Sequence, residues 1–257
     1  MPQPVNFAKF SPVDGGAAGP SAGGAGRVAA MLQDVARLFW PPTCLLCGDP
    51  GAGGRDLCAA CAAALPWNAV ACPRCALPLA LPAQACGACL RAPPPLAATR
   101  AAFVYAFPVD RLLPRLKFHQ GLAAGRLLSQ LAAEAFAHAP RPDALVPVPL
   151  HRSRLRARGY DQALELARPL ARALGVPLRD DLLRRVRATA PQSRLDAPAR
   201  RRNLRGAFAV DTGTPLPAHV ALFDDVMTTG ATLHAAADAL RRAGVARVEA
   251  WVCARVA

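Results

Sequence analysis

Residues 220–233, VALFDDVMTTGATL, decide the fold. The segment begins with a short apolar run, which is typical of a buried strand in a parallel sheet. Asp224 and Asp225 follow, and a Thr/Gly-rich turn then leads into a helical pattern over 231–244. Ligands of parallel sheets bind beyond the carboxyl ends of the strands. The segment therefore places two carboxylates where a ligand would lie.

The turn after the two aspartates has the chemistry of a phosphate site. Gly230 permits a tight backbone, and Thr228, Thr229 and Thr232 offer hydroxyl groups. The helix that follows presents free backbone N–H groups to an anion. The carboxylates repel phosphate, so they suit sugar hydroxyls or a metal ion instead. Because adjacent strand residues point in opposite directions, we expect the chain to turn directly after the aspartates, so that both face one ligand. The segment predicts a sugar phosphate.

Three other interpretations account for less of the segment. A strand, an Asp N-cap and a helix account for one aspartate and one threonine only. An acidic strand of a nucleotide hydrolase needs a G-x-x-x-x-G-K-[ST] loop elsewhere, and the sequence has none. A phosphotransfer receiver needs a separate acidic cluster earlier in the chain, which is also absent.

Strand and helix patterns alternate through the second half of the chain. Asp161 is a candidate N-cap and Gly175 a candidate C-cap of one predicted helix. The alternation predicts an α/β fold, a parallel sheet flanked by helices. The predicted strands cover 101–107, 144–150, 219–225 and 247–256, and the predicted helices cover 122–139, 161–175 and 231–244.

Eight of the nine cysteines form four CxxC pairs, each beginning 14 residues after the one before. Two such pairs hold one tetrahedral zinc, so the array predicts two closed, structural four-cysteine sites, in preference to disulfides or iron–sulfur. The spacing leaves open whether pairs combine sequentially or in a cross-braced manner, and we favour sequential ribbons. Cys253 stands apart and is expected to be a core thiol. The predicted ligands are Cys44, Cys47, Cys58, Cys61, Cys72, Cys75, Cys86 and Cys89.

Composition and pattern divide the 257 residues into four segments. We expect a disordered tail over 1–26, an amphipathic helix over 27–42, a double zinc ribbon over 43–91 and an α/β domain over 96–257. The helix would dock on the body of the protein or, as the alternative, contact a membrane surface. No signal peptide or membrane span is visible, so we expect a cytoplasmic protein. A net charge of +14 favours anionic partners.

ALFDDVMTTGATL closely resembles the phosphoribosyl diphosphate (PRPP) signature of type I phosphoribosyltransferases. With the cysteine array in front of it, the chain resembles the ComF family, competence-associated proteins with a zinc ribbon and a phosphoribosyltransferase domain. The resemblance implies that Asp224 and Asp225 hold the ribose hydroxyls at the catalytic centre. It implies Mg²⁺ with the diphosphate. It also implies a 5′-phosphate loop made of Val226, Met227, Thr228, Thr229, Gly230, Ala231 and Thr232.

Other stretches agree with this resemblance. VPVPLHRSRLRARGYDQALELA (146–167) is similar to the family's PVPL…R…RGFNQ segment, with Asp161 in place of Asn. A carboxylate there would weaken diphosphate binding unless it caps the helix or meets magnesium. The stretch 188–208 is similar to a segment that forms a mobile hood over the site. The resemblance assigns substrate contacts to Pro147, Val148, Pro149, Leu150, Arg154, Arg158, Lys117, Gln192, Arg201 and Asn203.

The sequence thus supports two readings of function. In the first, the protein binds PRPP and can transfer its ribosyl unit to an acceptor that the sequence does not identify. In the second, it handles single-stranded DNA during uptake, together with the uptake machinery, and PRPP is regulatory. The positive charge agrees with the second reading, but Trp67 is the one aromatic residue in the cysteine region available to stack on bases.

Overall fold

The structure is a computed structural model that describes residues 41–118, 121–187 and 206–257. The chain divides into two units, Met1–Pro41 and Pro42–Ala257, and every element below belongs to the second. The predicted tail and nearly all of the predicted helix over 27–42 lie outside the described residues. Within the described part of the chain, no helix combines the length and the apolar character needed to cross a membrane.

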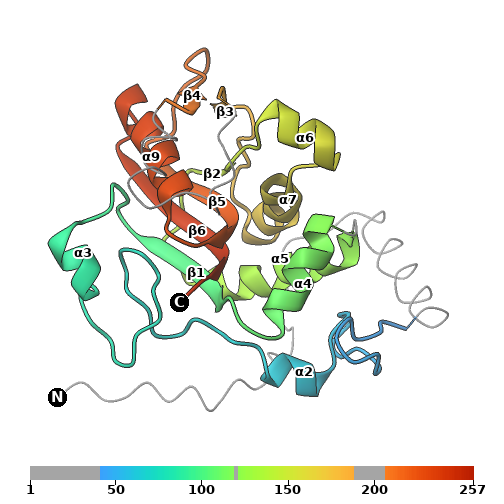
Figure 1. The fold of residues 1–257 in the computed structure, drawn as a ribbon. Coiled ribbons are helices and arrows are strands. Elements are labelled where there is room, and N and C mark those ends of the chain that lie inside the picture. The colour runs from blue at the N-terminus through green and yellow to red at the C-terminus, as the bar shows by residue number, and fades with distance from the viewer. Residues whose placement is uncertain (1–40, 119–120, 188–205) are drawn as a thin grey trace, which may run out of the picture. The chain divides into compact units, whose positions relative to one another are not determined.

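A four-stranded parallel sheet forms the centre of the second unit, as the sequence predicts (Figure 1). Its strands run in the order β1-β6-β5-β2, and every neighbouring pair is parallel. All four carboxyl ends therefore meet at one edge of the sheet, where the two aspartates of β5 lie. The strands are β1 (Thr99–Val104), β2 (Ala144–Pro147), β5 (His219–Met227) and β6 (Arg247–Arg255).

Helices cover both faces of the sheet. Along β5, Ala221 and Phe223 belong to one core, whereas Val220 and Leu222 belong to the other, as the two-residue period of a strand requires. The first core contains α4 (Val109–Phe118), α5 (Leu122–Phe136) and α7 (Gln162–Leu174). The second contains α9 (Ala231–Ala243) and a small antiparallel pair made of β3 (Leu183–Arg185) and β4 (Phe208–Val210).

The predicted caps of α7 are present in the structure. Asp161 accepts a hydrogen bond from the backbone N–H of Leu164, and Gly175 ends the helix at φ 62°, in the left-handed region. Two predicted strands are shorter than expected. β1 ends at Val104. β2 ends at Pro147, and although Val148 N still donates to Phe223 O, Pro149 lacks the N–H group that would continue the ladder. The helix expected over 122–139 ends at Phe136.

The sequence predicts a turn directly after Asp225, but in the structure the turn comes two residues later, after Met227. β5 continues through both aspartates to Met227, paired with β6 as far as Arg255. The regular alternation of its side chains nevertheless breaks at the aspartates, because Val226 packs against the same core as Phe223 and Met227 packs against the other. The strand is longer because β6, its neighbour on one side, is just as long, while β2 on the other side ends opposite Phe223. Within the described residues of the α/β domain, β3, β4, α4 and α6 (Arg152–Arg158) were not predicted from the sequence.

The cysteine region contains two ribbons built to the same plan. Each has an isolated antiparallel bridge around its first CxxC pair and a five-residue helix carrying its second pair. The first ribbon uses Thr43↔Pro50 and α2 (Ala59–Ala63), and the second uses Ala71↔Pro78 and α3 (Gly87–Arg91). The same plan in both ribbons indicates a duplicated unit.

The two ribbons join the α/β domain differently. The first contacts the helices through side chains, with Arg126 of α5 2.8 Å from Asp56. The second is attached through the backbone of its knuckle: Thr99 N donates to Pro73 O at 2.9 Å, and Thr99 Oγ1 donates to Arg74 O at 2.8 Å. The second ribbon is thus continuous with the edge of the sheet.

Candidate functional site: two cysteine clusters and a strand-end ligand site

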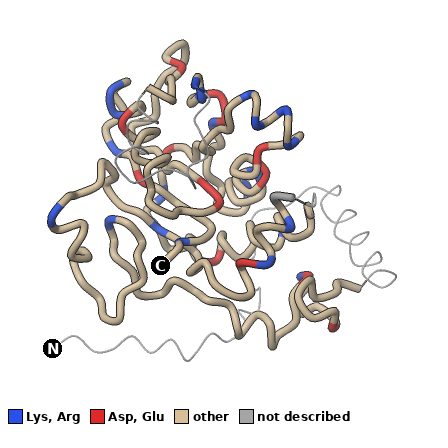
Figure 2. The backbone as a smooth tube through the Cα atoms, in the orientation of Figure 1, with Lys and Arg blue, Asp and Glu red and all other residues tan. Residues whose placement is uncertain are grey.

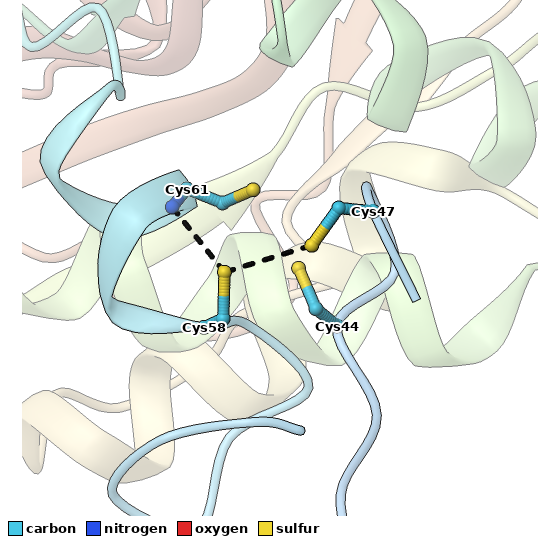
Figure 3. Close-up of side chains that lie close together, drawn as sticks. All are labelled: Cys44, Cys47, Cys58 and Cys61. Carbon is cyan, nitrogen blue, oxygen red and sulfur yellow. Dashed lines mark hydrogen bonds between the residues drawn. The ribbon is translucent and has the colours of Figure 1, made fainter. Parts of the chain in front are cut away.

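The eight paired cysteines form two clusters, and each cluster is sequential. In each one the four sulfur atoms all lie within 4.8 Å of one another. Figure 3 shows the first, in which the side chains from α2 and from the preceding turn converge on one point. The sequential pairing that the spacing favoured is the one observed, because a bridge and a short helix bring two successive CxxC pairs together. The clusters are Cys44, Cys47, Cys58, Cys61 and Cys72, Cys75, Cys86, Cys89.

The geometry of both clusters fits zinc. Four sulfurs at about 2.3 Å from a central tetrahedral ion lie roughly 3.8 Å apart. The Sγ atoms of Cys47 and Cys58 are 3.6 Å apart, and those of Cys75 and Cys86 are 3.7 Å apart. All four positions around the ion would be filled by protein, which leaves none for water or substrate. The two sites therefore fit two structural zinc ions, as predicted.

Backbone N–H groups prepare one thiol in each cluster for a metal. Burial raises the pKa of Cys44, but hydrogen bonds from the backbone N–H groups of Cys58, Cys47 and Leu46 outweigh it and lower the pKa to about 6. In the second cluster the same balance lowers the pKa of Cys72 to about 7. The thiol of Cys61 shows the opposite effect, since the neighbouring sulfur of Cys58 raises its pKa to about 11. Neighbouring thiolates repel one another, and a divalent cation offsets this repulsion by binding all four of them.

The two aspartates of β5 lie where the strand extends past β2. Asp224 is half-buried, and Asp225 is buried with 9% of its surface exposed. The carboxylates turn back onto the chain: Asp225 N donates to Asp224 Oδ1 at 2.8 Å, and Val226 N donates to Asp225 Oδ1 at 2.6 Å. These bonds fix one oxygen of each carboxylate at the carboxyl edge of the sheet.

The loop after β5 has the geometry of an anion site. Gly230 adopts φ 76° and forms the N-cap of α9 without a side-chain cap hydrogen bond. An added Cβ at Gly230 would lie 2.4 Å from Met227 Cε and 3.0 Å from His234 Nε2. The backbone conformation therefore favours glycine at this position, and an added Cβ would also displace the ends of two flexible side chains. Thr228 and Thr229 are exposed beside it, which leaves their hydroxyl groups accessible to a ligand.

Asp161 connects a second loop to this edge. Leu150 N donates to Asp161 Oδ2 at 2.7 Å, so the residue that caps α7 also holds the end of the stretch Pro147–Leu150. Burial raises the pKa of Asp161, as does the charge of Asp225, while backbone hydrogen bonds from Leu150, Leu164 and Ala163 oppose this. The substitution of Asp for the family's Asn thus has a capping role here.

Arginines surround the acidic groups. Arg158 donates to the side-chain oxygen of Gln162, a buried residue at the start of α7. Arg185 on β3 is buried, with its guanidinium carbon 5.4 Å from the ring centroid of Phe208. Burial lowers the pKa of Arg185, and the charge of Arg154 lowers it further, whereas Asp224 and Asp161 raise it. Arg185 therefore lies within electrostatic range of Arg154, Asp161 and Asp224.

The remaining predicted contacts have different outcomes. Lys117 lies on α4, and its side chain is outside what the structure describes. Gln192, Arg201 and Asn203 lie outside the described residues. Sequence reasoning did not select Arg185 or Gln162. Gln162 sits in the RGYDQ motif, which could have indicated it, but nothing local to LRR (183–185) distinguishes Arg185 from the other arginines.

Comparisons with known proteins agree with both parts of the structure. Residues 35–90 match the double zinc ribbon domain, and residues 160–257 match the phosphoribosyl transferase domain. The chain is 38% identical over 228 residues to DNA utilization protein YhgH of Salmonella typhi, which covers 85% of this chain and 99% of that protein. It is 36% identical to the protein of the same name in Escherichia coli strain K12, with the same coverage. It is 37% identical over 192 residues to Competence protein F of Haemophilus influenzae, covering 72% of this chain and 84% of that protein.

Two four-cysteine zinc ribbons joined to a phosphoribosyltransferase-type α/β domain define the class of protein. Relatives that align over nearly their whole length narrow the class to one family. The chain belongs to the ComF family.

Proposed function

We propose that the protein binds PRPP with Mg²⁺ at the carboxyl edge of its sheet. The observation that carries the proposal is the sequence of groups along β5 and α9: two carboxylates held by their own backbone, then a glycine-capped helix start without a side-chain cap. Asp224 and Asp225 would bind the ribose hydroxyls. Thr228 to Thr232 would surround the 5′-phosphate, because free N–H groups at a helix start favour an anion.

The diphosphate would lie toward the other loop and α6. Pro147 ends the neighbouring strand β2, the stretch to Leu150 follows it, and Arg154 and Arg158 lie on α6. Guanidinium groups suit diphosphate oxygens because they present paired donors. Mg²⁺ is commonly bound by one or two carboxylates together with substrate phosphates, and Asp224, Asp225 and Asp161 supply carboxylates at this edge. The predicted hood residues Gln192, Arg201 and Asn203, together with Lys117, complete the proposed set.

Ribosyl transfer would break the bond between the anomeric carbon and the diphosphate oxygen through an oxocarbenium-like state. The carboxylates would stabilise the developing positive charge, and the arginines would hold the departing diphosphate. The acceptor would then form the new bond to the same carbon.

Calorimetric titration with PRPP and Mg²⁺ tests the proposal. We expect Asp224→Asn and Asp225→Asn to weaken binding by roughly 10- to 100-fold, because each removes a hydrogen bond from a charged acceptor, worth about 1.5–3 kcal/mol. Asp238→Asn is the matched control, since Asp238 is an exposed acid on α9 away from the loop. Omitting Mg²⁺ should also weaken binding. Failure of the wild-type protein to bind PRPP would overturn the proposal.

A second candidate, binding of single-stranded DNA, is supported by α6 and by the names of the relatives. The helix has the sequence RSRLRAR, and the basic positions of this part of the chain are blue in Figure 2. Arg152 and Arg156 are exposed. The relatives are named for DNA utilization and competence. In this candidate the basic helix would contact the nucleic-acid backbone, and PRPP would regulate the contact.

Fluorescence anisotropy with a labelled single-stranded oligonucleotide tests this second candidate. Replacing Arg152 and Arg156 by alanine should lower the slope of log K against log salt by about 1.4, or roughly 0.7 for each lost phosphate contact. The control is the corresponding double variant of Arg241 and Arg242, which are exposed at the end of α9. The absence of binding by the wild-type protein at low salt, or an equal loss in both variants, would exclude α6 as a DNA contact.

A further inference from the structure

Arg255 is the last residue of β6 and bonds to two parts of the protein that are distant in sequence. Its Nε donates to the carbonyl oxygen of Cys75 at 2.9 Å, and its Nη1 donates to the carbonyl oxygen of Met227 at 3.3 Å. Cys75 belongs to the second cysteine cluster, and Met227 is the last residue of β5, directly before the threonines of the proposed phosphate loop. One half-buried guanidinium group thus joins the backbone of a metal site to the backbone of the loop.

Both ends of this connection are held firmly. Met227 O also accepts the backbone N–H of Val256 at 3.0 Å, and Met227 pairs in register with Arg255. On the other side, Ala76, next to Cys75, adopts φ 54°, and its carbonyl accepts from the side chain of Asn68 at 2.9 Å. A conformation that is strained for alanine persists only where its surroundings determine it. The four cysteine sulfurs around a metal are one such surrounding.

Side-chain packing also connects the second cysteine cluster to the loop. Cys75 contacts the core that contains Met227, Leu233 and Val252, and it also contacts the cluster formed by its fellow ligands. The first cysteine cluster has no comparable bond to the loop among the described residues. Its ribbon contacts α4 and α5, for example through Arg126 and Asp56. A change at the second site therefore has a direct path to the loop that a change at the first site lacks.

We propose that Arg255 is a positioning residue that couples the second cysteine site to the loop Met227–Thr232. Metal at Cys72, Cys75, Cys86 and Cys89 holds the Cys75 carbonyl in place, Arg255 transmits that position to Met227, and the loop is ordered for a phosphate group. Because coupling between two binding sites is reciprocal, a ligand on the loop also strengthens metal binding at the second site. The effect of a loop ligand on metal binding rests on the PRPP binding proposed above.

The first experiment needs no ligand. Hydrogen exchange of the peptide that covers residues 226–233 is measured by mass spectrometry in full-length variants. Cys89→Ser disables the second site and should accelerate exchange in this peptide at least about threefold, whereas Cys61→Ser, which disables the first site, should not. Arg255→Lys keeps the charge but loses the fork that spans two carbonyls, so it should accelerate exchange with all cysteines intact. Combining it with Cys89→Ser should add little.

The second experiment measures the reverse effect. Alkylation of each cysteine by N-ethylmaleimide is followed by peptide mass spectrometry, with and without PRPP and Mg²⁺. PRPP should slow alkylation of the second-site cysteines at least about threefold and leave the first-site cysteines unchanged. Arg255→Lys should abolish the difference. Thr99→Val is the matched control, because it removes another bond between this ribbon and the sheet, Thr99 Oγ1 to Arg74 O, and leaves Arg255 intact.

The outcomes separate this inference from the proposed function. If the wild-type protein does not bind PRPP, the proposed function fails, and the exchange experiment still decides the coupling. The coupling is overturned if Cys61→Ser and Cys89→Ser accelerate loop exchange equally. It is also overturned if Thr99→Val removes the PRPP effect as completely as Arg255→Lys, because general packing would then account for it.

Discussion

The carboxylate of Asp161 accepts the backbone N–H of Leu150 at 2.7 Å with one oxygen and that of Leu164 at 3.2 Å with the other. One side chain thus caps α7 and holds the loop that follows β2. The cost is a half-buried negative charge near Asp225, which raises the pKa of Asp161 together with burial. The charge of Asp161 is therefore electrostatically unfavourable, but its carboxylate holds the loop after β2 in place.

We predict that Asp161 makes stability depend on pH in a defined direction. Its pKa is higher in the folded protein than in the unfolded chain. Its stabilising contribution is therefore complete below the unfolded pKa of about 3.9 and declines as the pH rises through the folded pKa. In urea denaturation, the wild type should lose stability relative to Asp161→Asn as the pH rises from about 4 to 7. Parallel curves for the two proteins would contradict the prediction.

Gly230→Ala should disturb both stability and the proposed site. The φ of 76° strains alanine, and the new Cβ would lie 2.4 Å from Met227 Cε. We expect the free energy of unfolding to fall by about 2–4 kcal/mol and PRPP affinity to fall with it. Gly53→Ala is the control, since Gly53 has φ 61° but no atom within 4 Å of its Cβ position. It should cost only about 1 kcal/mol and leave affinity unchanged.

Metal analysis should find two zinc ions per chain, because both cysteine clusters are closed by four sulfurs. Cys61→Ser should reduce the content to about one, since three thiolates no longer complete the tetrahedron. Cys253→Ala should retain two, because Cys253 is buried in β6 and belongs to neither cluster. Equal zinc loss in both variants would show that zinc release follows general destabilisation.

Glu249→Gln should reduce stability without affecting the ligand site. Glu249 is fully buried and accepts from Arg247 Nε at 2.9 Å, and His219 Nε2 lies 3.3 Å from it. We expect a loss of about 1–3 kcal/mol, less than for a fully buried pair because Arg247 is half exposed. PRPP affinity should not change, since Glu249 lies near the amino end of β6.

The ion pair between the partly buried Arg179 and the exposed Asp181 provides the comparison for Glu249. Asp181→Asn should cost less than about 1 kcal/mol, because solvent screens a pair whose carboxylate is exposed. Denaturation of the two variants under the same conditions checks the difference. Similar losses in both would mean that the burial of Glu249 does not set its contribution.

Much of the fold follows from local patterns. The apolar run before Asp224 predicted a buried strand, and Asp161 and Gly175 marked the two ends of α7 correctly, because caps act within a few residues. The length of β5 could not be predicted in this way. It depends on pairing with β6 as far as Arg255, and that partner is distant in sequence.

The sequence by itself determined the chemistry of this protein: eight thiols in pairs, two carboxylates and a glycine turn ahead of a helix. These are short-range features, and residue type and spacing are enough to recognise them. Only the tertiary structure decided which pairs of cysteines share a site, that Arg185 lies near Asp224 and Asp161, and that Arg255 joins Cys75 to Met227. Each of these brings together segments from separate elements, so their proximity arises from sheet order and packing and leaves no mark in the local sequence.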